Sequence, residues 1–481
     1  MSRLRQWVQD GGSRAASRAR ERLGSEGGPE PTRQTLDQPR IVPGPAPTTA
    51  TEEESLDVWG FSDTRFQVND NGNVELTGTR YPLSGYELPK LLPWIEGVMQ
   101  VKVDTREVNT SNYPPPISEP RTHDAFMKDL STVFEADQLC TDARQRLRHG
   151  HGHTQEEMYA IKYGELARIP DLVVHPTEQE QVVALVEAAQ RHDVCLIPYG
   201  GGTNVTNALR CPENDERMMV SVDMRRMNRI LWIDPVDQMA CIQAGAVGRH
   251  IVTQLAEHGY TLGHEPDSVE FSTLGGWVAT HASGMKKNRY GNIEDIVLDV
   301  NVVTAHGTLS RTTVAPRESV GSDPRRWVLG SEGNLGIITQ AVVKLAKLPE
   351  VQRYGSVAFP TFEAGMGFLY SLTRAGDLPA SVRLVDNLQF QLSMALKPAV
   401  TGLDARKSEL QKLFVTRVKG FETDEMVACT LVFEGGRAEV EAQEEHVYGL
   451  AARYGGLKSG SSNGERGYQL TFGIAYIRDF I

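Results

Sequence analysis

The sequence predicts an α+β protein in which a ligand-binding domain is covered by a second α+β unit. Between residues 166 and 348, strand-like apolar runs alternate with helical patterns. Glycine-rich segments interrupt this region where strands end, as in sites that bind anions. From residue 349 onward, the order of strands and helices suits an antiparallel sheet with helices on one face. We therefore expect a ligand-binding domain at 166–348 and a cap at 349–481.

Two regions precede the ligand-binding domain. Residues 1–55 start with many arginines and continue into a Pro/Gly/Thr-rich stretch, so a disordered targeting or linker segment is expected. Residues 56–165 are expected to form a hairpin and helical region. Its hairpin pairs Phe66–Val68 with Val74–Leu76 around Asn71-Gly72, and a helix follows at about 125–134.

Composition narrows the possible partners and location. The net charge of −12 argues against a generic nucleic-acid binder, so no nucleic acid is expected. The five cysteines are odd in number and widely scattered, which indicates a reduced compartment. No apolar run approaches the roughly 18 residues of a membrane-spanning helix.

The segment from His149 to His153 alternates histidine with glycine and has two interpretations. Alternating imidazoles can converge on a metal ion, but no cysteine or carboxylate set accompanies them and glycines hold such ligands poorly. The other interpretation is a loop or helix start beside the ligand-binding domain. We favour the loop and expect no metal site.

The most informative segment follows the apolar run 194–197, which predicts a strand. A helix with a capping box from Thr177 to Glu180 precedes this strand, so the segment ends a strand of a β-α-β unit. Successive glycines carry no Cβ, so their backbone N–H groups can approach a polyanion such as a pyrophosphate closely. The candidate residues are Pro198, Tyr199, Gly200, Gly201, Gly202, Thr203 and Asn204.

Two further segments mix glycines with small and hydroxyl residues. The candidates in the second segment are Asp267, Ser268, Val269, Glu270, Phe271, Ser272, Thr273, Thr280, His281, Ala282, Ser283, Gly284, Met285 and Lys286. Those in the third are Gly330, Ser331, Glu332, Gly333, Asn334, Leu335 and Gly336. None of the three segments fits a P-loop or a Rossmann fingerprint.

These segments resemble the FAD-binding domain of the vanillyl-alcohol oxidase and cresol methylhydroxylase (PCMH-type) flavoproteins. Within that superfamily, longer strings resemble the alkyldihydroxyacetonephosphate synthase family, and the resemblance extends from about Trp59 to the last residue. The strings run from Gly263 to Ser268, Gly284 to Asn288, Tyr290 to Asp295, Tyr354 to Pro360 and Ala475 to Asp479. The resemblance implies a two-subdomain FAD-binding domain followed by an incomplete α+β cap.

The resemblance also implies a cofactor and a reaction. FAD would be held by the three glycine-rich segments. The acyl group of acyl-dihydroxyacetone phosphate would be exchanged for a long-chain fatty alcohol without net oxidation, which is an ether-lipid-forming step. The cofactor would supply the electronics, and the protein would supply binding, orientation and proton transfer.

Two arginines of the cap are candidate site residues. Arg383 lies in an apolar strand at 381–385, where its charge needs either a ligand anion or an acid such as Asp386. The residues alone leave both options open. The resemblance implies a catalytic role for Arg383 and contact between Arg478 and the substrate phosphate, although Asp479 is adjacent to Arg478.

The position at which the sequence ends affects the activity that we expect of this chain. The resemblance implies a catalytic tyrosine and a triple-histidine segment beyond the Ala475–Asp479 string, whereas the chain stops at Ile481. We therefore expect a fragment or short product, without a closed cap and without turnover of its own. A flavin oxidoreductase of the 2-hydroxyacid dehydrogenase type and an inactive flavin-binding protein remain alternatives.

Location and assembly rest on the resemblance. It implies the lumenal side of the peroxisome, with peripheral membrane contact, because the substrates carry long chains. Arg3-Leu4 begins a peroxisomal signal pattern, but the His-Leu that completes it does not follow, and a mitochondrial presequence is a rival interpretation. We also expect a homodimer.

Overall fold

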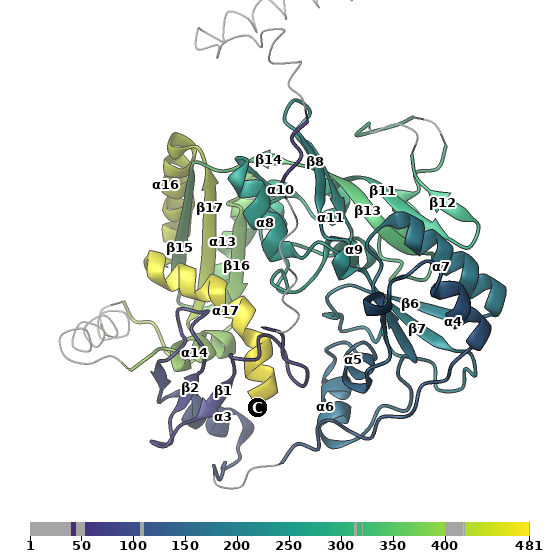
Figure 1. Cartoon of the computed structure of the whole chain (residues 1–481). Helices are drawn as coiled ribbons and strands as arrows, with labels where there is room; N and C mark the ends of the chain where they lie inside the picture. The colour runs from purple at the N-terminus through teal and green to yellow at the C-terminus, as the bar shows by residue number, and fades with distance from the viewer. Residues whose placement is uncertain are drawn as a thin grey trace, which may run out of the picture.

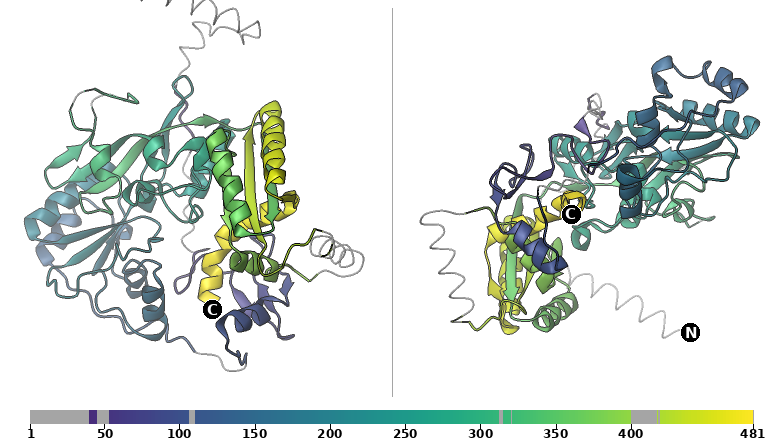
Figure 2. Two further views of the ribbon diagram at one scale, coloured as in Figure 1. Left: turned by 180° about the vertical axis from the view of Figure 1, so that it is seen from behind. Right: turned by 90° about the horizontal axis from the view of Figure 1, so that it is seen from below.

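The computed structural model describes residues 40–44, 53–105, 110–311, 315–319, 321–399, 417 and 419–480. Figure 1 shows the sheets of the ligand-binding domain beside a separate cap sheet, and Figure 2 shows the same separation from behind and below. Most of residues 1–55, where disorder is expected, lie outside the described ranges. Ile41, however, pairs with Ile233 in an antiparallel bridge, so ordered contacts begin earlier than the sequence predicts.

The first sheet of the ligand-binding domain positions the first glycine-rich segment. Its strand order is β4-β5-β7-β6, and β7 pairs in parallel with both β5 and β6. The strands are β4 (Leu139–Cys140), β5 (Leu172–Val174), β6 (Cys195–Tyr199) and β7 (Met219–Asp223). Because parallel strands end at the same edge, the residues that follow β6 and β7 lie together, where ligands of open α/β sheets bind.

Helix α7 (Gln179–His192) precedes β6 and packs on this sheet through apolar residues at helical spacing, including Val182 and Leu185. The predicted capping box is wrong. The helix is preceded by Glu178, which makes no side-chain cap, and the N–H and hydroxyl of Thr177 donate instead to Gln181 Oε1. The neighbouring helix α4 (Asp124–Leu130) is shorter than the predicted 125–134.

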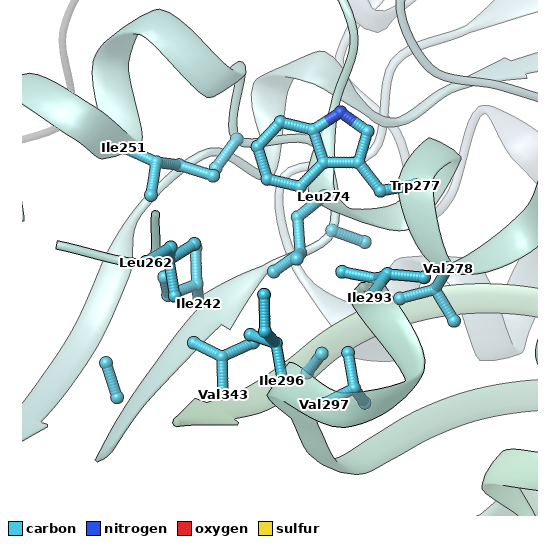
Figure 3. Close-up of a cluster of buried hydrophobic side chains, with 14 of the residues drawn as sticks. Ile242, Ile251, Leu262, Leu274, Trp277, Val278, Ile293, Ile296, Val297 and Val343 are labelled. Atoms are coloured by element: carbon cyan, nitrogen blue, oxygen red, sulfur yellow. The ribbon is translucent and has the colours of Figure 1, made fainter. Parts of the chain in front are cut away.

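The second sheet is antiparallel, with strand order β12-β11-β13-β9-β8. The strands are β8 (Ile230–Asp234), β9 (Met239–Gln243), β11 (Val297–Thr304), β12 (Gly307–Leu309) and β13 (Ile337–Lys344). Helices α8 (Gly248–Glu257), α9 (Leu274–Ala279) and α11 (Ile293–Ile296) pack on it. Figure 3 shows the core between them, where Trp277 and Leu274 of α9 face Ile242 of β9. Alternating strands and helices thus build this domain as predicted.

The cap contains an antiparallel sheet with strand order β16-β17-β15-β18. Its strands are β15 (Val351–Phe359), β16 (Ser381–Val385), β17 (Val427–Gly435) and β18 (Leu457–Lys458). Helices α13 (Phe362–Ala375) and α16 (Arg437–Arg453) share one apolar core with Cys429 and Leu431 of β17.

A long helix, α17 (Ser461–Phe480), covers the opposite face of the cap sheet, so the prediction of helices on one face is wrong. Thr430 lies between Cys429 and Leu431 and faces the other way, toward Gly467 of α17, whose added Cβ would lie 2.5 Å from Thr430 Cγ2. In Figure 1, α17 is the yellow helix that ends the chain.

The N-terminal region divides between the two units. The predicted hairpin is confirmed, because β1 (Phe66–Val68) pairs with β2 (Val74–Leu76) through a turn in which Gly72 has a φ of 76°. This hairpin, β3 (Glu87–Leu88) and α3 (Leu91–Met99) pack against α17 and α14 (Asn387–Ala395) of the cap. In contrast, α5 (Ala143–Arg148) packs against β5 of the first sheet.

The remaining elements are short, and none has more than nine residues. They are η2 (Ala136–Gln138), α6 (Gln155–Tyr163), η3 (Met224–Arg226), β10 (Tyr260–Thr261), α10 (Lys287–Tyr290), α12 (Arg325–Val328) and β14 (Ala346–Lys347). Within the described ranges, no helix has the length and apolar character needed to cross a bilayer.

Candidate cofactor and substrate site

The three glycine-rich segments meet at the C-terminal edge of the first sheet. A Cβ added to Gly200 in the first segment would lie 2.4 Å from Thr273 Oγ1 in the second. A Cβ on Gly333 in the third segment would lie 3.1 Å from the ring of Pro198. The N–H of Glu332 donates to Ala279 O in α9 at 2.8 Å. The loop after β6 is therefore enclosed by the α9 region and by the segment before β13.

The structure shows a further role of the triple glycine, which the sequence did not predict. A Cβ on Gly201 would lie 2.1 Å from the carbonyl oxygen of Phe271, which is backbone and has no room to move aside. Gly202 has a φ of 66°, a conformation that favours glycine. The glycines thus allow two loops of the chain to pack backbone to backbone, as well as leaving space for a ligand.

The first segment is rich in free hydrogen-bond donors. The backbone N–H groups of residues 200–204 donate to no acceptor within the described ranges. In the third segment, the N–H groups of Gly330 and Glu332 donate to Val278 O and Ala279 O. In the second, Ser272 Oγ donates to Ser268 O at 2.9 Å and accepts from Trp277 Nε1 at 2.7 Å. Within the described ranges, Ser283 N–H in the second segment and Gly333 N–H in the third also donate to no acceptor, so all three segments can present donors to a ligand.

The candidate cofactor residues differ in exposure. The buried ones are Tyr199, Gly201, Gly202, Val269, Phe271, Ser272, Thr273, Gly284 and Lys286. The exposed ones are Asp267, Thr280, His281, Ser283, Gly330, Asn334 and Leu335, and the others are half-buried.

The histidine segment packs against the first glycine-rich segment. The N–H of His153 donates to Asn204 O at 2.8 Å, and a Cβ on Gly152 would lie 2.5 Å from the same oxygen. The ring of His149 contacts Tyr199 and places Nε2 2.9 Å from Asp223 Oδ2. This is the predicted loop beside the ligand-binding domain.

A buried group of charges lies under this edge of the sheet. The carboxylate of Asp223, the last residue of β7, accepts from Arg225, which also donates to Glu54 at 3.1 Å. Burial opposes ionisation of Asp223, but Arg225 and His149 hold its pKa well below the usual range. The side chain of Arg148 lies 4.0 Å from Glu54. These charges stabilise the ends of β6 and β7 below the glycines.

Arg383 is not paired with Asp386, so the ion pair that the sequence allowed does not form. Asp386 instead accepts from Gln389 N–H at the start of α14, at 2.8 Å. The Arg383 guanidinium donates to Thr471 Oγ1 of α17 and contacts Met285 Sδ at 3.4 Å. It thus points from the cap toward the second glycine-rich segment. Burial raises the pKa of the nearby Asp267 carboxyl, and the positive charge of Arg383 opposes that rise.

Arg478 joins the end of α17 to the histidine segment. Its Nη1 donates to His153 O at 2.8 Å, and its Nε donates to Asp479 Oδ1 at 2.7 Å. The adjacent acid therefore engages part of the guanidinium, as the sequence suggested. The link to His153 brings Arg478 close to the first glycine-rich segment.

Lys286, a candidate cofactor residue, is engaged by carboxylates. Its Nζ lies 2.7 Å from Glu265 Oε1 and 2.6 Å from Glu434 Oε1. Tyr468 of α17 donates to the other oxygen of Glu265 at 2.6 Å. No periodic pattern in the sequence predicts this network, because its members come from both domains.

Several buried polar atoms beside the first segment have no hydrogen-bond partner within the described ranges. They include Tyr199 Oη, His151 Nε2, His153 Nδ1 and Arg148 Nη1. Buried polar groups are nearly always satisfied, so these atoms and the free N–H groups of 200–204 indicate a ligand. Phosphate oxygens accept from N–H and guanidinium groups, and ribose or ribityl hydroxyls donate to imidazole nitrogens. The residues present therefore fit FAD, whose ring system supplies electron-accepting chemistry that side chains lack.

Comparison with known proteins agrees with this fit. Residues 170–313 match the family described as "FAD binding domain", and residues 348–470 match "FAD linked oxidases, C-terminal domain". The alkyldihydroxyacetonephosphate synthase of Caenorhabditis elegans is 42% identical over 426 residues, which cover 88% of this chain and 70% of that protein. The chain belongs to the alkyldihydroxyacetonephosphate synthase family. The predicted family and the FAD cofactor are thus confirmed.

Solved structures give the same picture. An alkyldihydroxyacetonephosphate synthase superimposes with a TM-score of 0.80 at 32% identity, covering 89% of this chain and 79% of that one. p-Cresol methylhydroxylase with substrate bound superimposes with a TM-score of 0.56 at 18% identity, which shows the PCMH-type fold alone. The mitochondrial D-lactate dehydrogenase (cytochrome) of Arabidopsis thaliana is 28% identical over 267 residues, covering 55% of this chain and 45% of that protein. Similarity to members of the synthase family therefore extends over more of the chain.

Proposed function

We propose that this protein catalyses an FAD-dependent ether-forming exchange. The acyl group of acyl-dihydroxyacetone phosphate is replaced by a long-chain fatty alcohol, giving alkyl-dihydroxyacetone phosphate without net oxidation. Membership of the alkyldihydroxyacetonephosphate synthase family supports this proposal, because the similarity covers both the flavin domain and most of the cap.

The observation that carries the proposal is the placement of Arg383. Its guanidinium enters from the cap, contacts Met285 beside the glycine-rich segments, and forms no ion pair within the described ranges. A cation held by neutral groups remains available to an anionic substrate or to charge that develops during reaction. We assign Arg383 a catalytic role and Arg478 a role in binding the substrate phosphate. The three glycine-rich segments bind the cofactor.

The test compares ether formation in two arginine variants. A form restored to full length is loaded with FAD and incubated with acyl-dihydroxyacetone phosphate and labelled hexadecanol, and labelled alkyl-dihydroxyacetone phosphate is measured. Arg383→Lys is expected to lose most of the product while retaining flavin, because lysine lacks the planar fork of donors. Arg374→Lys, on the exposed side of α13, serves as the matched control. Equal product from both variants would remove Arg383 from the mechanism.

The second candidate is a flavin oxidoreductase acting on 2-hydroxy acids. The similarity to a D-lactate dehydrogenase over 55% of this chain favours it. Anaerobic mixing with D-lactate or glycolate distinguishes the two, because an oxidoreductase bleaches its flavin whereas the exchange reaction leaves the flavin oxidised overall. Bleaching without ether product would favour the oxidoreductase.

Peripheral membrane contact is the proposed route to long-chain substrates. Val98, Met99, Val101 and Val103 are exposed apolar side chains at and just after the end of α3, and such patches suit an interfacial position. Flotation with liposomes tests this, with Val98→Asp and Val101→Asp expected to weaken binding. Binding that is unchanged in both variants would place the membrane contact elsewhere.

The remaining assignments rest on the resemblance to the family. We propose a flavin domain at 166–348, preceded by the regions 1–55 and 56–165 and followed by a cap at 349–481. We also propose a homodimer on the lumenal face of the peroxisomal membrane. Light scattering of the purified protein and imaging of a tagged full-length form test the assembly and the location.

A further inference from the structure

Three basic side chains come together where α3, α14 and α17 pack against one another. Lys90 immediately precedes α3, Lys397 follows the end of α14, and Arg466 lies in the first half of α17. Figure 1 shows α14 next to α3, with α17 crossing the cap beside them.

One apolar cluster contains residues from all three helices. Leu91, Leu396 and Leu470 belong to this cluster, and each is a neighbour of one cation. Leu91 follows Lys90, Leu396 precedes Lys397, and Leu470 lies one turn from Arg466 on the same helix face. Each cation is therefore attached to the chain beside this core, and the charges of Arg466 and Lys90 both act on Lys397.

The electrostatic environment of Lys397 reflects this grouping. Its side chain is half-buried, and burial, followed by the positive charges of Arg466 and Lys90, lowers its pKa to about 8. Burial also lowers the pKa of Arg466. Like charges that lie close together in a partly buried position repel one another unless an anion binds between them.

Nearby carboxylates do not neutralise these cations. Arg466 donates to the neutral side chain of Asn463 at 3.0 Å, and none of the three cations forms an ion pair within the described ranges. Glu87 accepts from three asparagines, and Glu96 pairs with Lys102. Trp94, one turn after Lys90, also has a buried Nε1 without an acceptor in that part of the chain. Among the described residues, the place thus contains donors and positive charge but no carboxylate that pairs with them.

We propose that Lys90, Lys397 and Arg466 form a phosphate-binding site separate from the glycine-rich segments. Arg466 and Arg478 lie twelve residues apart on α17, about 18 Å along the helix axis, so the site also differs from the one assigned to Arg478. Its ligand is a phosphate group with at least one negative charge, carried by a soluble monoester or by a lipid headgroup. The site does not depend on ether formation and is tested without turnover.

The amine of Lys397 provides a direct probe of the site. An amine with a pKa of about 8 is substantially deprotonated near neutral pH and reacts with acylating reagents, whereas a bound phosphate raises the pKa and protects the amine. Acylation followed by mass spectrometry of the whole protein measures the rate at Lys397, with and without inorganic phosphate, at constant ionic strength set with chloride. We expect the rate to fall by about tenfold for each unit by which phosphate raises the pKa.

Two variants and two types of vesicle decide the outcome. Arg466→Gln should abolish the protection by phosphate, whereas Arg453→Gln, on the exposed surface of α16, should retain it. Protection by phosphatidic acid vesicles, with phosphatidylcholine vesicles inactive, assigns the ligand to a lipid headgroup. Protection by inorganic phosphate alone assigns it to a soluble monoester. Absence of protection by both, or equal protection in Arg466→Gln, would overturn the proposal.

Discussion

The ammonium group of Lys286 lies 2.6 Å from Glu434 Oε1, and this contact joins the flavin domain to the central strand pair of the cap. Lys286 immediately precedes α10, and Glu434 lies in β17. Glu265 holds the same ammonium at 2.7 Å. Burial alone would lower the pKa of Lys286, but the two carboxylates raise it above the usual value. One cation is therefore shared by two acids at the boundary between the domains.

Lys286→Met should strongly destabilise the protein. The substitution leaves Glu265 and Glu434 close together without a cation, and removing one partner of a buried ionic group costs about 3–5 kcal/mol. Glu434→Gln should cost less, because the remaining Lys286–Glu265 pair is neutral. Urea unfolding measures both, and Glu439→Gln in the partly exposed Arg289 pair serves as the control, with about 1 kcal/mol or less expected. The loss in Lys286→Met should shrink at mildly acidic pH, because protonation removes the repulsion.

Gly201→Val should abolish flavin binding. A Cβ at this position would lie 2.1 Å from Phe271 O, so the first and second segments cannot both keep their positions. Purified wild-type protein should be yellow and release its flavin on denaturation, whereas the variant should be colourless. Gly436→Ala is the control, because an added Cβ there has no atom within 4 Å. Stoichiometric flavin in the Gly201 variant would contradict the assignment of the first segment.

Local sequence signals predicted the elements better than the contacts between them. The hairpin at 66–76 and the strand Ser381–Val385 follow from alternation and turn residues, and both are present with the predicted bounds. The glycine-rich segments were also identified from sequence, because successive glycines where a strand ends indicate close approach of the backbone to another group.

Contacts between distant segments were not predictable in the same way. The bonds from His153 to Asn204 and from Lys286 to Glu434 join residues far apart in the chain, so no periodicity reveals them. Helix α17 was missed because Gly464, Gly467 and Gly473 lower its helix propensity. Tertiary contact explains two of these glycines, because Gly464 and Gly467 touch the cap sheet.

Alanine at two helical glycines should have opposite effects on stability. A Cβ on Gly464 would lie 2.2 Å from Gly355 O, a backbone atom of β15, so Gly464→Ala should force α17 away from the sheet and cost about 1–3 kcal/mol. Gly449 lies on the exposed side of α16 with no atom within 4 Å of an added Cβ, so Gly449→Ala should stabilise by about 1 kcal/mol. Thermal unfolding compares the two, and equal shifts would mean that α17 does not approach β15 closely.

Acid should destabilise the protein partly through His264. Burial lowers the pKa of this side chain to about 4, whereas an unfolded histidine titrates near about 6.5. The unfolded state therefore binds more protons between these values, and stability falls as pH drops from about 6.5 toward 4. His264→Leu should make the unfolding free energy less dependent on pH in this window. Identical profiles for wild type and the His264 variant would show that other groups account for the acid sensitivity.

Arg478→Lys should weaken substrate binding while leaving flavin content unchanged. The guanidinium already donates through Nη1 to His153 O and through Nε to Asp479, and this fixes the orientation of its fork. Lysine offers a point charge instead, and loss of a charge-assisted contact costs about 1.5–3 kcal/mol, roughly a ten- to hundredfold loss of affinity. Titration with an alkyl-dihydroxyacetone phosphate, followed by flavin absorbance, measures the dissociation constant. Asp479→Asn should instead strengthen ligand binding, because it removes the acid that competes with the phosphate for Arg478. The asparagine keeps a side-chain oxygen that can accept from Trp59 N–H, as Asp479 does. If both variants bind the ligand as tightly as the wild type, the phosphate site lies elsewhere.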